Sequence, residues 1–400
     1  MRSRPTVAAL ALAAASLAPV ATRGQDPAER VAGTLAATAR SFDATSVTGA
    51  GLDWLVAEAR VAHAVLVGES HGNPQTLRLV EHLLRELAAH GFGRYVIENG
   101  KVTTGHLARL LRDDGVAAAE AWLRAQPFSM AFLNWREEIV HADAAIRAGY
   151  DLVGIDQEFA GSARFLLGRL VELAPDAAAR ELAAGWAAKE AAAFGHFPRP
   201  GNTSRGSPAA PPTAAHAALP RAFPDEPAAT IVAELQATAR IYALHHAGRH
   251  FDNHRERARL MKAHLQATGG SRLVVRLGAM HCGRGHSPLL QLDVGNHLAE
   301  LAARDGGDTL HVQVLARRSR TPDGGHEPLA RAPWLQPLLD AAPDDAGAVF
   351  DLRPLRAVFV PAAAQRSAPE LCDLVRRYDV AVVFPHFDRC TELVPTPGGR

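Results

Sequence analysis

Short apolar runs alternate along the chain with segments in which apolar residues recur every three or four positions. The runs AHAVLV (62–67), RYVIE (94–98), DLVGID (151–156), RLVVRL (272–277), TLHVQVLA (309–316) and DVAVVFPHF (379–387) predict buried strands. Helical periodicity lies between them, near 106–112, 136–147, 176–194, 229–265, 293–301 and 371–378. This alternation predicts an α/β fold, a largely parallel β-sheet flanked by helices.

The clearest strand-to-helix unit follows the first apolar run. Asn73 can cap a helix that has Pro74 at its first position, and Gly91 can end it. The apolar stripe of this helix consists of Leu77, Val80, Leu83, Leu84 and Leu87. We therefore expect an amphipathic helix packed on the sheet.

Residues 198–227 are rich in Pro and Ala and keep neither a period of two nor one of 3.6, so we expect a long loop. Together with the helices on either side, this loop predicts a helical insertion over 176–250, which interrupts the sheet and caps a ligand-binding cleft. The α/β core then consists of 25–175 and 251–400.

Two motifs of the form Gly-x-x-His follow predicted strands. Gly68-Glu69-Ser70-His71 comes after the first run and Gly278-Ala279-Met280-His281 after the fourth. Successive strands also end in Glu69, Glu98 and Asp156. Ligands of open α/β sheets bind at the carboxyl edge of the strands, so we expect these side chains to share one cleft. His386 also follows a strand, but a structural role is the better interpretation of that residue.

Composition narrows the class of partner. Among 400 residues, 43 basic side chains nearly cancel 42 acidic ones, so the chain has no large net positive charge that would attract nucleic acid. We therefore expect a small-molecule substrate. Most of the 19 histidines are expected to be bystanders.

The N-terminus indicates export. Arg2 and Arg4 precede an apolar stretch, 7–21, too short and Ala-rich for a membrane span, which predicts a signal peptide over residues 1–24. The mature protein is then periplasmic or secreted, without stable membrane insertion. An oxidising compartment permits disulfides, so a bridge between Cys372 and Cys390 is open, with Cys282 left over.

The motifs, taken in order, resemble a known superfamily. GESHG, VIE, WREEIVHADAAIRAGYDLVGID, NHRERARLMKAHL and DVGNHLAEL are similar to the erythromycin esterase family and its relatives, the ChaN-type haem-binding lipoproteins and the TIKI/TraB proteins. The resemblance covers roughly 62–387. It departs at Gly278-Ala279-Met280-His281, where the esterases usually have His-Asn-x-His, so macrolide esterase activity in particular does not follow.

The resemblance implies that Glu69, His71, Glu98 and His281 line the site. Gly68, Asn73, Asp156, Arg255 and Arg259 are the expected substrate or ligand contacts. The esterase branch implies hydrolysis of an ester or amide, with water activated by His71 and a carboxylate. Ser70 is not a nucleophile, because the G-x-S-x-G elbow is absent.

Three alternatives stay open. Glu69, His71, Glu98 and His281 could hold a divalent metal, as in a metal-dependent peptidase of the TIKI/TraB type. A ChaN-type protein would bind haem or iron, with His71, His281, Cys282 or Tyr95 as ligands. The chain could also be an inactive exported scaffold in which the histidines only satisfy hydrogen bonds.

Overall fold

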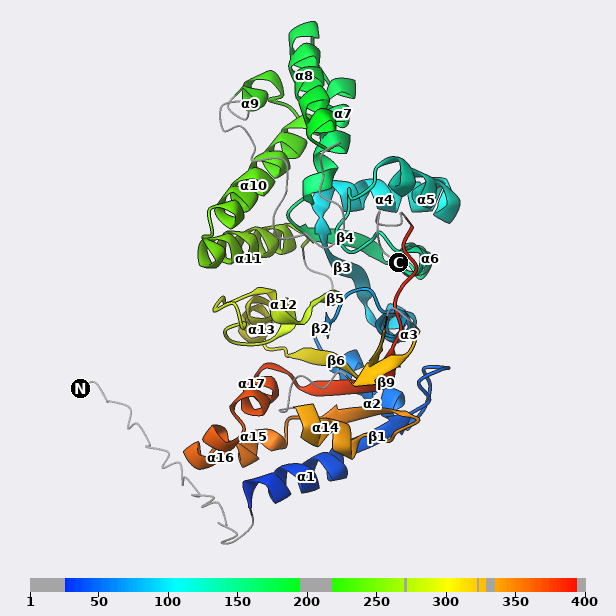
Figure 1. The fold of residues 1–400 in the computed structure, drawn as a ribbon, viewed down its shortest axis with the longest axis vertical. Helices are drawn as coiled ribbons and strands as arrows, with labels where there is room; N and C mark the ends of the chain where they lie inside the picture. The colour runs from blue at the N-terminus through cyan, green and yellow to red at the C-terminus, as the bar shows by residue number, and fades with distance from the viewer. Residues whose placement is uncertain (1–25, 195–217, 270–271, 322–323, 329–334, 394–400) are drawn as a thin grey trace, which may run out of the picture.

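One mixed β-sheet organises the molecule. The computed structural model describes residues 26–194, 218–269, 272–321, 324–328 and 335–393, so the predicted signal peptide and most of the 198–227 loop lie outside it. In this described part nine strands form one sheet in the order β1-β8-β9-β6-β2-β5-β3-β4, with β7 on β6 (Figure 1). The strands are β1 (Ala39–Phe42), β2 (Ala64–Glu69), β3 (Phe92–Gly100), β4 (Asp151–Asp156), β5 (Arg272–Gly278), β6 (Thr309–Arg320), β7 (His326–Pro328), β8 (Gly347–Asp351) and β9 (Val380–Phe387).

The six predicted strands form the parallel centre of the sheet. β9, β6, β2, β5, β3 and β4 are neighbours in that order, and each pair is parallel. β1 and β8 were not predicted; they extend the sheet by antiparallel pairing beside β9. Both are only four or five residues long, too short for a periodic pattern to separate them from a buried loop.

Helices cover both faces of the sheet. Strand residues alternate between the faces, so Val65 and Val67 join one apolar cluster while Ala64 and Leu66 join another. The first face carries α2 (Ala50–Val61), α3 (Pro74–Leu87), α4 (Lys101–Asp113), α5 (Gly115–Ala125) and α6 (Arg136–Arg147). The second carries α1 (Pro27–Thr38), α11 (His250–Ala267), α12 (Ala279–Cys282), α13 (Val294–Arg304), α14 (Gln336–Ala341), α15 (Leu355–Val358), α16 (Ala362–Ser367) and α17 (Pro369–Arg377).

The predicted first helix is confirmed in detail. The Asn73 side chain accepts the Thr76 N–H at 3.0 Å, and Pro74 occupies the first helical position. After a single 3-10 turn at Ala88–His90, Gly91 ends the element at φ 81°, which favours glycine. All five residues of the predicted stripe are buried.

A group of helices lies between β4 and β5 in the sequence. α7 (Ala163–Glu172), α8 (Ala177–Phe194), α9 (Leu219–Ala222) and α10 (Ala228–His246) pack around their own apolar cluster, beyond edge strand β4 at the top of Figure 1. The single helix predicted over 229–265 is wrong, because α10 ends at His246 and α11 begins at His250. Gly248, at φ 71°, makes the turn between them. The domain boundaries at 175 and 250 stay predictions.

The bridge between Cys372 and Cys390 is corrected. Both thiols are free and buried, as is Cys282. Cys372 lies on α17, before β9, and Cys390 follows β9.

Within the described ranges, every helix is either too short or too polar to cross a bilayer.

Candidate functional site

The two Gly-x-x-His motifs meet at the carboxyl edge of adjacent strands. β2 and β5 pair in parallel, with Glu69 opposite Gly278. β3, which carries Glu98, is the next strand, and β4 ends in Asp156 beside it. The predicted convergence of Glu69, His71, Glu98 and His281 is therefore what the structure shows, with Asp156 at its margin.

The carboxylate of Glu98 lies between the two histidines. Its Oε2 is 3.6 Å from Nε2 of His71, and its Oε1 is 3.5 Å from Nε2 of His281. The same carboxylate accepts the Gly278 N–H at 2.6 Å and an N–H of Arg257 at 2.5 Å. Glu98 is 5% exposed, so these bonds form away from bulk water.

Each histidine is held from behind by a second carboxylate. Nδ1 of His71 lies 3.0 Å from Glu69 Oε1, and Nδ1 of His281 lies 2.8 Å from Asp293 Oδ2. An ionised carboxylate only accepts hydrogen bonds, so Nδ1 carries the proton in both rings. Both Nε2 atoms are thereby left facing Glu98, ready to exchange protons.

Burial and charge act in opposite directions on these groups. Burial lowers the pKa of His71, but its hydrogen bond to Glu69 and the charge of Glu98 outweigh it, so the pKa is raised above 6.5. His281 is similar: burial opposes and Glu98 and Asp293 prevail, which raises its pKa. Burial also opposes ionisation of Glu98, yet His281 and Arg257 lower its pKa to about 2.

Two glycines create the space for this arrangement. A Cβ on Gly278 would lie 3.0 Å from His71 Nε2 and 3.1 Å from Glu98 Oε2. A Cβ on Gly68 would lie 2.8 Å from the hydroxyl of Tyr378 and 3.1 Å from the Ala279 backbone. Gly68 therefore admits the segment that carries His281 and does not itself contact the histidine pair.

Gly278→Ala should reduce turnover far more than stability. The added methyl must displace two buried side-chain atoms by a few tenths of an ångström, and misplacement of reacting groups lowers rates steeply, here by about 10-fold or more in kcat. Gly105→Ala on α4, where nothing lies within 4 Å, is the matched control and should leave kcat unchanged. Steady-state kinetics and melting temperatures measure the two effects. Equal kcat values for Gly278→Ala and the parent would contradict a role of His71 and Glu98 in turnover.

Aromatic side chains surround His71. The ring of Phe132 stacks on the imidazole at 3.6 Å between centroids, with 11° between the planes. Gly72, at φ 78°, lies against the indole of Trp135, where a Cβ would be 3.1 Å from the ring. The 127–135 loop therefore covers one face of His71, whose side chain is 23% exposed.

The arginine that reaches the site is Arg257, which the sequence analysis passed over. Arg255 and Arg259 are exposed and pair with Asp252 and Glu256 on their own helix. Arg257 instead donates to Asp156 at 2.9 Å and to Glu98. The buried positions of α11, Ala258, Met261 and Leu265, mark the inward face, and Arg257 is four residues before Met261 on that side.

Three further polar residues were missed. Asp293 precedes α13 and both caps this helix and holds His281. Arg276 and Glu138, from β5 and α6, lie behind Glu69. A charged residue inside the apolar run RLVVRL was the available signal for Arg276. Asn73, expected to contact ligand, is 4% exposed and its side chain is engaged as the helix cap.

The residues do not fit a metal ion. The carboxylates of Glu69 and Glu98 are already bonded to the guanidiniums of Arg276 and Arg257. In the described ranges no group of three or more His, Cys, Asp or Glu side chains is arranged to hold a metal. Of the four residues expected to ligate one, Glu69 and Glu98 are bonded to arginine, His71 to Glu69 and His281 to Asp293.

Haem ligation fits no better. The hydroxyl of Tyr95 is 2.8 Å from His141 Nε2 in the core, and Tyr95 is 1% exposed. Cys282 is fully buried and its Sγ–H donates to the Val67 carbonyl. His281 is 3% exposed, and its Nδ1 is bonded to Asp293. Of these four residues only His71 has an exposed edge. Two of them could bind haem iron from opposite sides only if the surrounding side chains rearranged.

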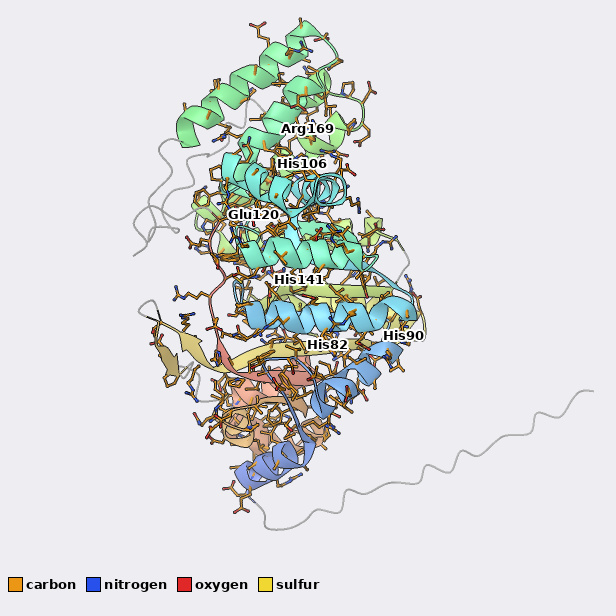
Figure 2. The ribbon with its side chains drawn as sticks, turned by 90° about the vertical axis from the view of Figure 1, so that its right-hand side faces the viewer. His82, His90, His106, Glu120, His141 and Arg169 are labelled. Atoms are coloured by element: carbon orange, nitrogen blue, oxygen red, sulfur yellow. The ribbon has the colours of Figure 1, made fainter. Side chains whose placement is uncertain are left out.

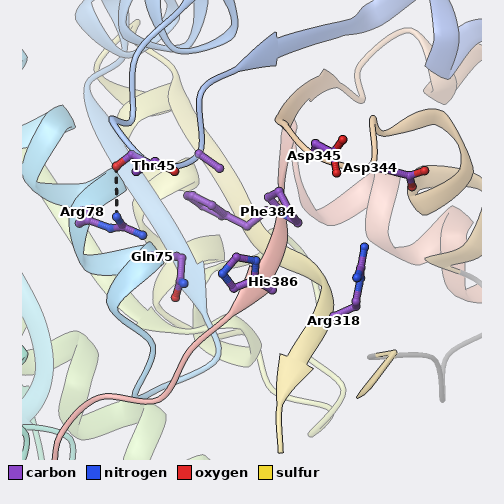
Figure 3. Close-up of a pocket in the computed structure, with 10 residues that line it drawn as sticks. Thr45, Gln75, Arg78, Arg318, Asp344, Asp345, Phe384 and His386 are labelled. Atoms are coloured by element: carbon purple, nitrogen blue, oxygen red, sulfur yellow. Dashed lines mark hydrogen bonds between the residues drawn. The ribbon is translucent and has the colours of Figure 1, made fainter. Parts of the chain in front are cut away.

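Several other histidines lie outside this group of site residues. His82, His106 and His141 come from α3, α4 and α6, which lie side by side over the first face of the sheet (Figure 2). His386, at the end of β9, lines a separate 270 Å³ pocket with Gln75, Arg78 and Arg318 (Figure 3). The site uses two of the histidines.

Comparison with known proteins supports the fold. No model of a protein family matches the chain, and no curated protein matches its sequence. A mutant of the erythromycin esterase EreC in its open conformation is similar in structure, with a TM-score of 0.60 and 14% identity, over 90% of this chain and 100% of the other.

Two further solved structures agree. A succinoglycan biosynthesis protein has a TM-score of 0.60 at 12% identity, over 92% of this chain and 99% of its own. A Bacillus cereus protein has a TM-score of 0.56 at 12% identity, over 91% and 99%. The fold that the resemblance implied is therefore confirmed: this chain is folded as the erythromycin esterase EreC is.

Proposed function

We propose that the protein is an exported hydrolase that cleaves an ester or amide bond in a small molecule. The observation that supports this most is the pair of carboxylate-backed histidines, whose Nε2 atoms both face Glu98 at 3.6 and 3.5 Å. A histidine oriented through Nδ1 is the standard device for moving a proton at Nε2. The likeness to the esterase fold is consistent with that chemistry.

His71 is the general base, because its ring has the exposed edge. Neutral Nε2 takes a proton from water while the water oxygen bonds to the carbonyl carbon. Glu69 and Glu98 stabilise the imidazolium that forms. The step leaves a tetrahedral oxyanion and a protonated His71.

His281 is the general acid. Glu98 and Asp293 raise the pKa of His281 and so favour its protonated form, from which Nε2 can donate first a hydrogen bond to the oxyanion and then a proton to the leaving oxygen or nitrogen as that bond breaks. The products are a carboxylic acid and an alcohol or amine. Solvent then takes the proton from His71 and supplies a new proton to His281.

The test is hydrolysis by the mature chain. Purified protein should turn over at least one member of a panel of aryl esters, lactones and anilides, and activity should survive exhaustive chelation. N-terminal sequencing of the secreted product should begin near residue 25. Turnover of no member of the panel, or loss of all activity with the chelator, would contradict the proposal.

The pH dependence should follow His71. The base must be neutral, so kcat/KM should rise as pH increases through the pKa of His71, which lies above 6.5. Glu69→Gln removes a carboxylate that raises this pKa, so the rise should move to lower pH. Profiles from pH 5 to 9 measure both; an unshifted limb in Glu69→Gln would show that another group controls the rate.

A further inference from the structure

A charged side chain is buried in the apolar face of the sheet directly behind the site. Arg276 lies opposite Val67 of β2, two residues before the Gly278 that pairs with Glu69. Side chains on a strand alternate, so Arg276 and Glu69 point to the same face, the one that α6 covers. Arg276 is 3% exposed there, where an unpaired charge would be very costly.

This guanidinium joins two carboxylates. One amino group of Arg276 donates to both oxygens of Glu69, each at 3.1 Å, and to Glu138 Oε1 at 2.8 Å. The other donates to Glu138 Oε2 at 2.6 Å. Glu138, from α6, is fully buried, and no bond joins it to His71 among the described residues. Arg276 thus connects α6 to Glu69.

The bridge bears directly on the base. Glu69 Oε1 accepts from both Arg276 and Nδ1 of His71. Glu138 engages both amino groups of the guanidinium, which limits how far Arg276 can draw Glu69 away from the imidazole. Two carboxylates therefore share one guanidinium, and Glu69 is held by Arg276 on one side and by Nδ1 of His71 on the other.

Two further polar groups packed near this bridge add no charge to it. His141, also on α6, is bonded to Tyr95. Burial lowers the pKa of His141 and raises that of Tyr95, so both are neutral near pH 7.

We propose that Arg276 and Glu138 are positioning residues, which hold the Glu69 carboxylate against Nδ1 of His71 and thereby fix which ring nitrogen is available to take the proton from water. This inference rests on the proposed hydrolysis for its kinetic consequence. Its structural consequence, the protonated nitrogen of His71, can be measured in the protein without any substrate.

The experiment compares Glu138→Gln and Arg276→Lys with the unchanged protein. Glutamine keeps the shape of Glu138 but loses its charge, so Arg276 should turn to Glu69 and weaken the bond to His71. Lysine keeps a charge but cannot bridge both carboxylates. In ¹⁵N spectra of labelled histidine, His71 should be protonated at Nδ1 in the parent and become a mixture of tautomers in both variants.

The kinetic readout follows from the same change. Misplacing a reacting group by about 1 Å can cost about 100-fold in rate, so we expect kcat to fall by about 10- to 100-fold with KM within about threefold. Asp379→Asn is the matched control. Asp379 is 3% exposed and bonded to Arg284 and Arg356, each at 2.7 Å, outside the site. Its loss should lower the melting temperature but leave the His71 spectrum and kcat unchanged.

The outcomes separate the two proposals. A His71 spectrum that is the same in Glu138→Gln, Arg276→Lys and the parent would overturn the positioning role, even if both variants are less stable. If the parent hydrolyses no substrate but both variants still change the tautomer of His71, this inference holds and the proposed function fails. If Glu138→Gln does not fold, Arg276→Lys alone decides the outcome.

Discussion

Replacing His71 with asparagine should lower kcat/KM for hydrolysis by about 10²- to 10⁴-fold, the usual contribution of a general base. Asparagine can keep a hydrogen bond to Glu69 but has no nitrogen that takes a proton from water. His281→Asn should cost a similar factor through loss of the acid. Folding should be preserved in the first variant, because the side chain of His71 is 23% exposed.

His386→Asn is the control for this experiment. His386 also follows a parallel strand at the same edge of the sheet, but it lines the pocket of Figure 3 and its side chain is 45% exposed. We expect its kcat/KM to stay within about twofold of the parent, as for a surface residue without a catalytic role. Equal activity of the His71 variant and the parent, measured at several pH values, would remove His71 as the base.

Arg257→Met should lower the free energy of unfolding by about 3–5 kcal/mol. It leaves Glu98 and Asp156, 5% and 4% exposed, without their shared cation. Arg255→Met, two residues earlier on α11, removes an exposed arginine that pairs only with Asp252, and should cost less than about 0.5 kcal/mol. Urea unfolding of both variants measures the difference.

The pH dependence of that stability has a definite sign. The pKa of Glu98 is about 2 in the folded protein, below its ordinary 4.5. Its ionised form therefore stabilises the fold fully above pH 4.5, and this contribution is lost as the pH falls through 2. The deficit of Arg257→Met should accordingly be largest near neutrality and shrink in acid. A deficit that does not change with pH would mean that Arg257 acts by packing alone.

Helices α3 and α11 show how much of the helical structure the sequence predicts. The first was predictable from end to end because its cap, its first proline, its stripe and its terminating glycine are all local signals. The second was merged with α10, because Gly248 interrupts an apolar pattern that continues on both sides. That error in the helix also hid which arginine faces the site.

β1 and β8 illustrate a different limit. Their stability comes from pairing with β9 and with each other, partners that lie far away in the sequence. A segment of four or five residues is too short for its periodicity to predict such pairing. The parallel strands were found because burial on both faces makes them continuously apolar.

The sequence by itself determined the parallel core, the first helix and the convergence of Glu69, His71, Glu98 and His281, because strand ends in a parallel sheet share one edge. Only the tertiary structure decided which groups surround them. Arg257, Asp293 and the Arg276–Glu138 bridge come from other elements, and their roles depend on distances of 2.5–3.1 Å between segments far apart in the chain or across a turn. Hydrogen bonds of that length are fixed by packing, which no local pattern encodes.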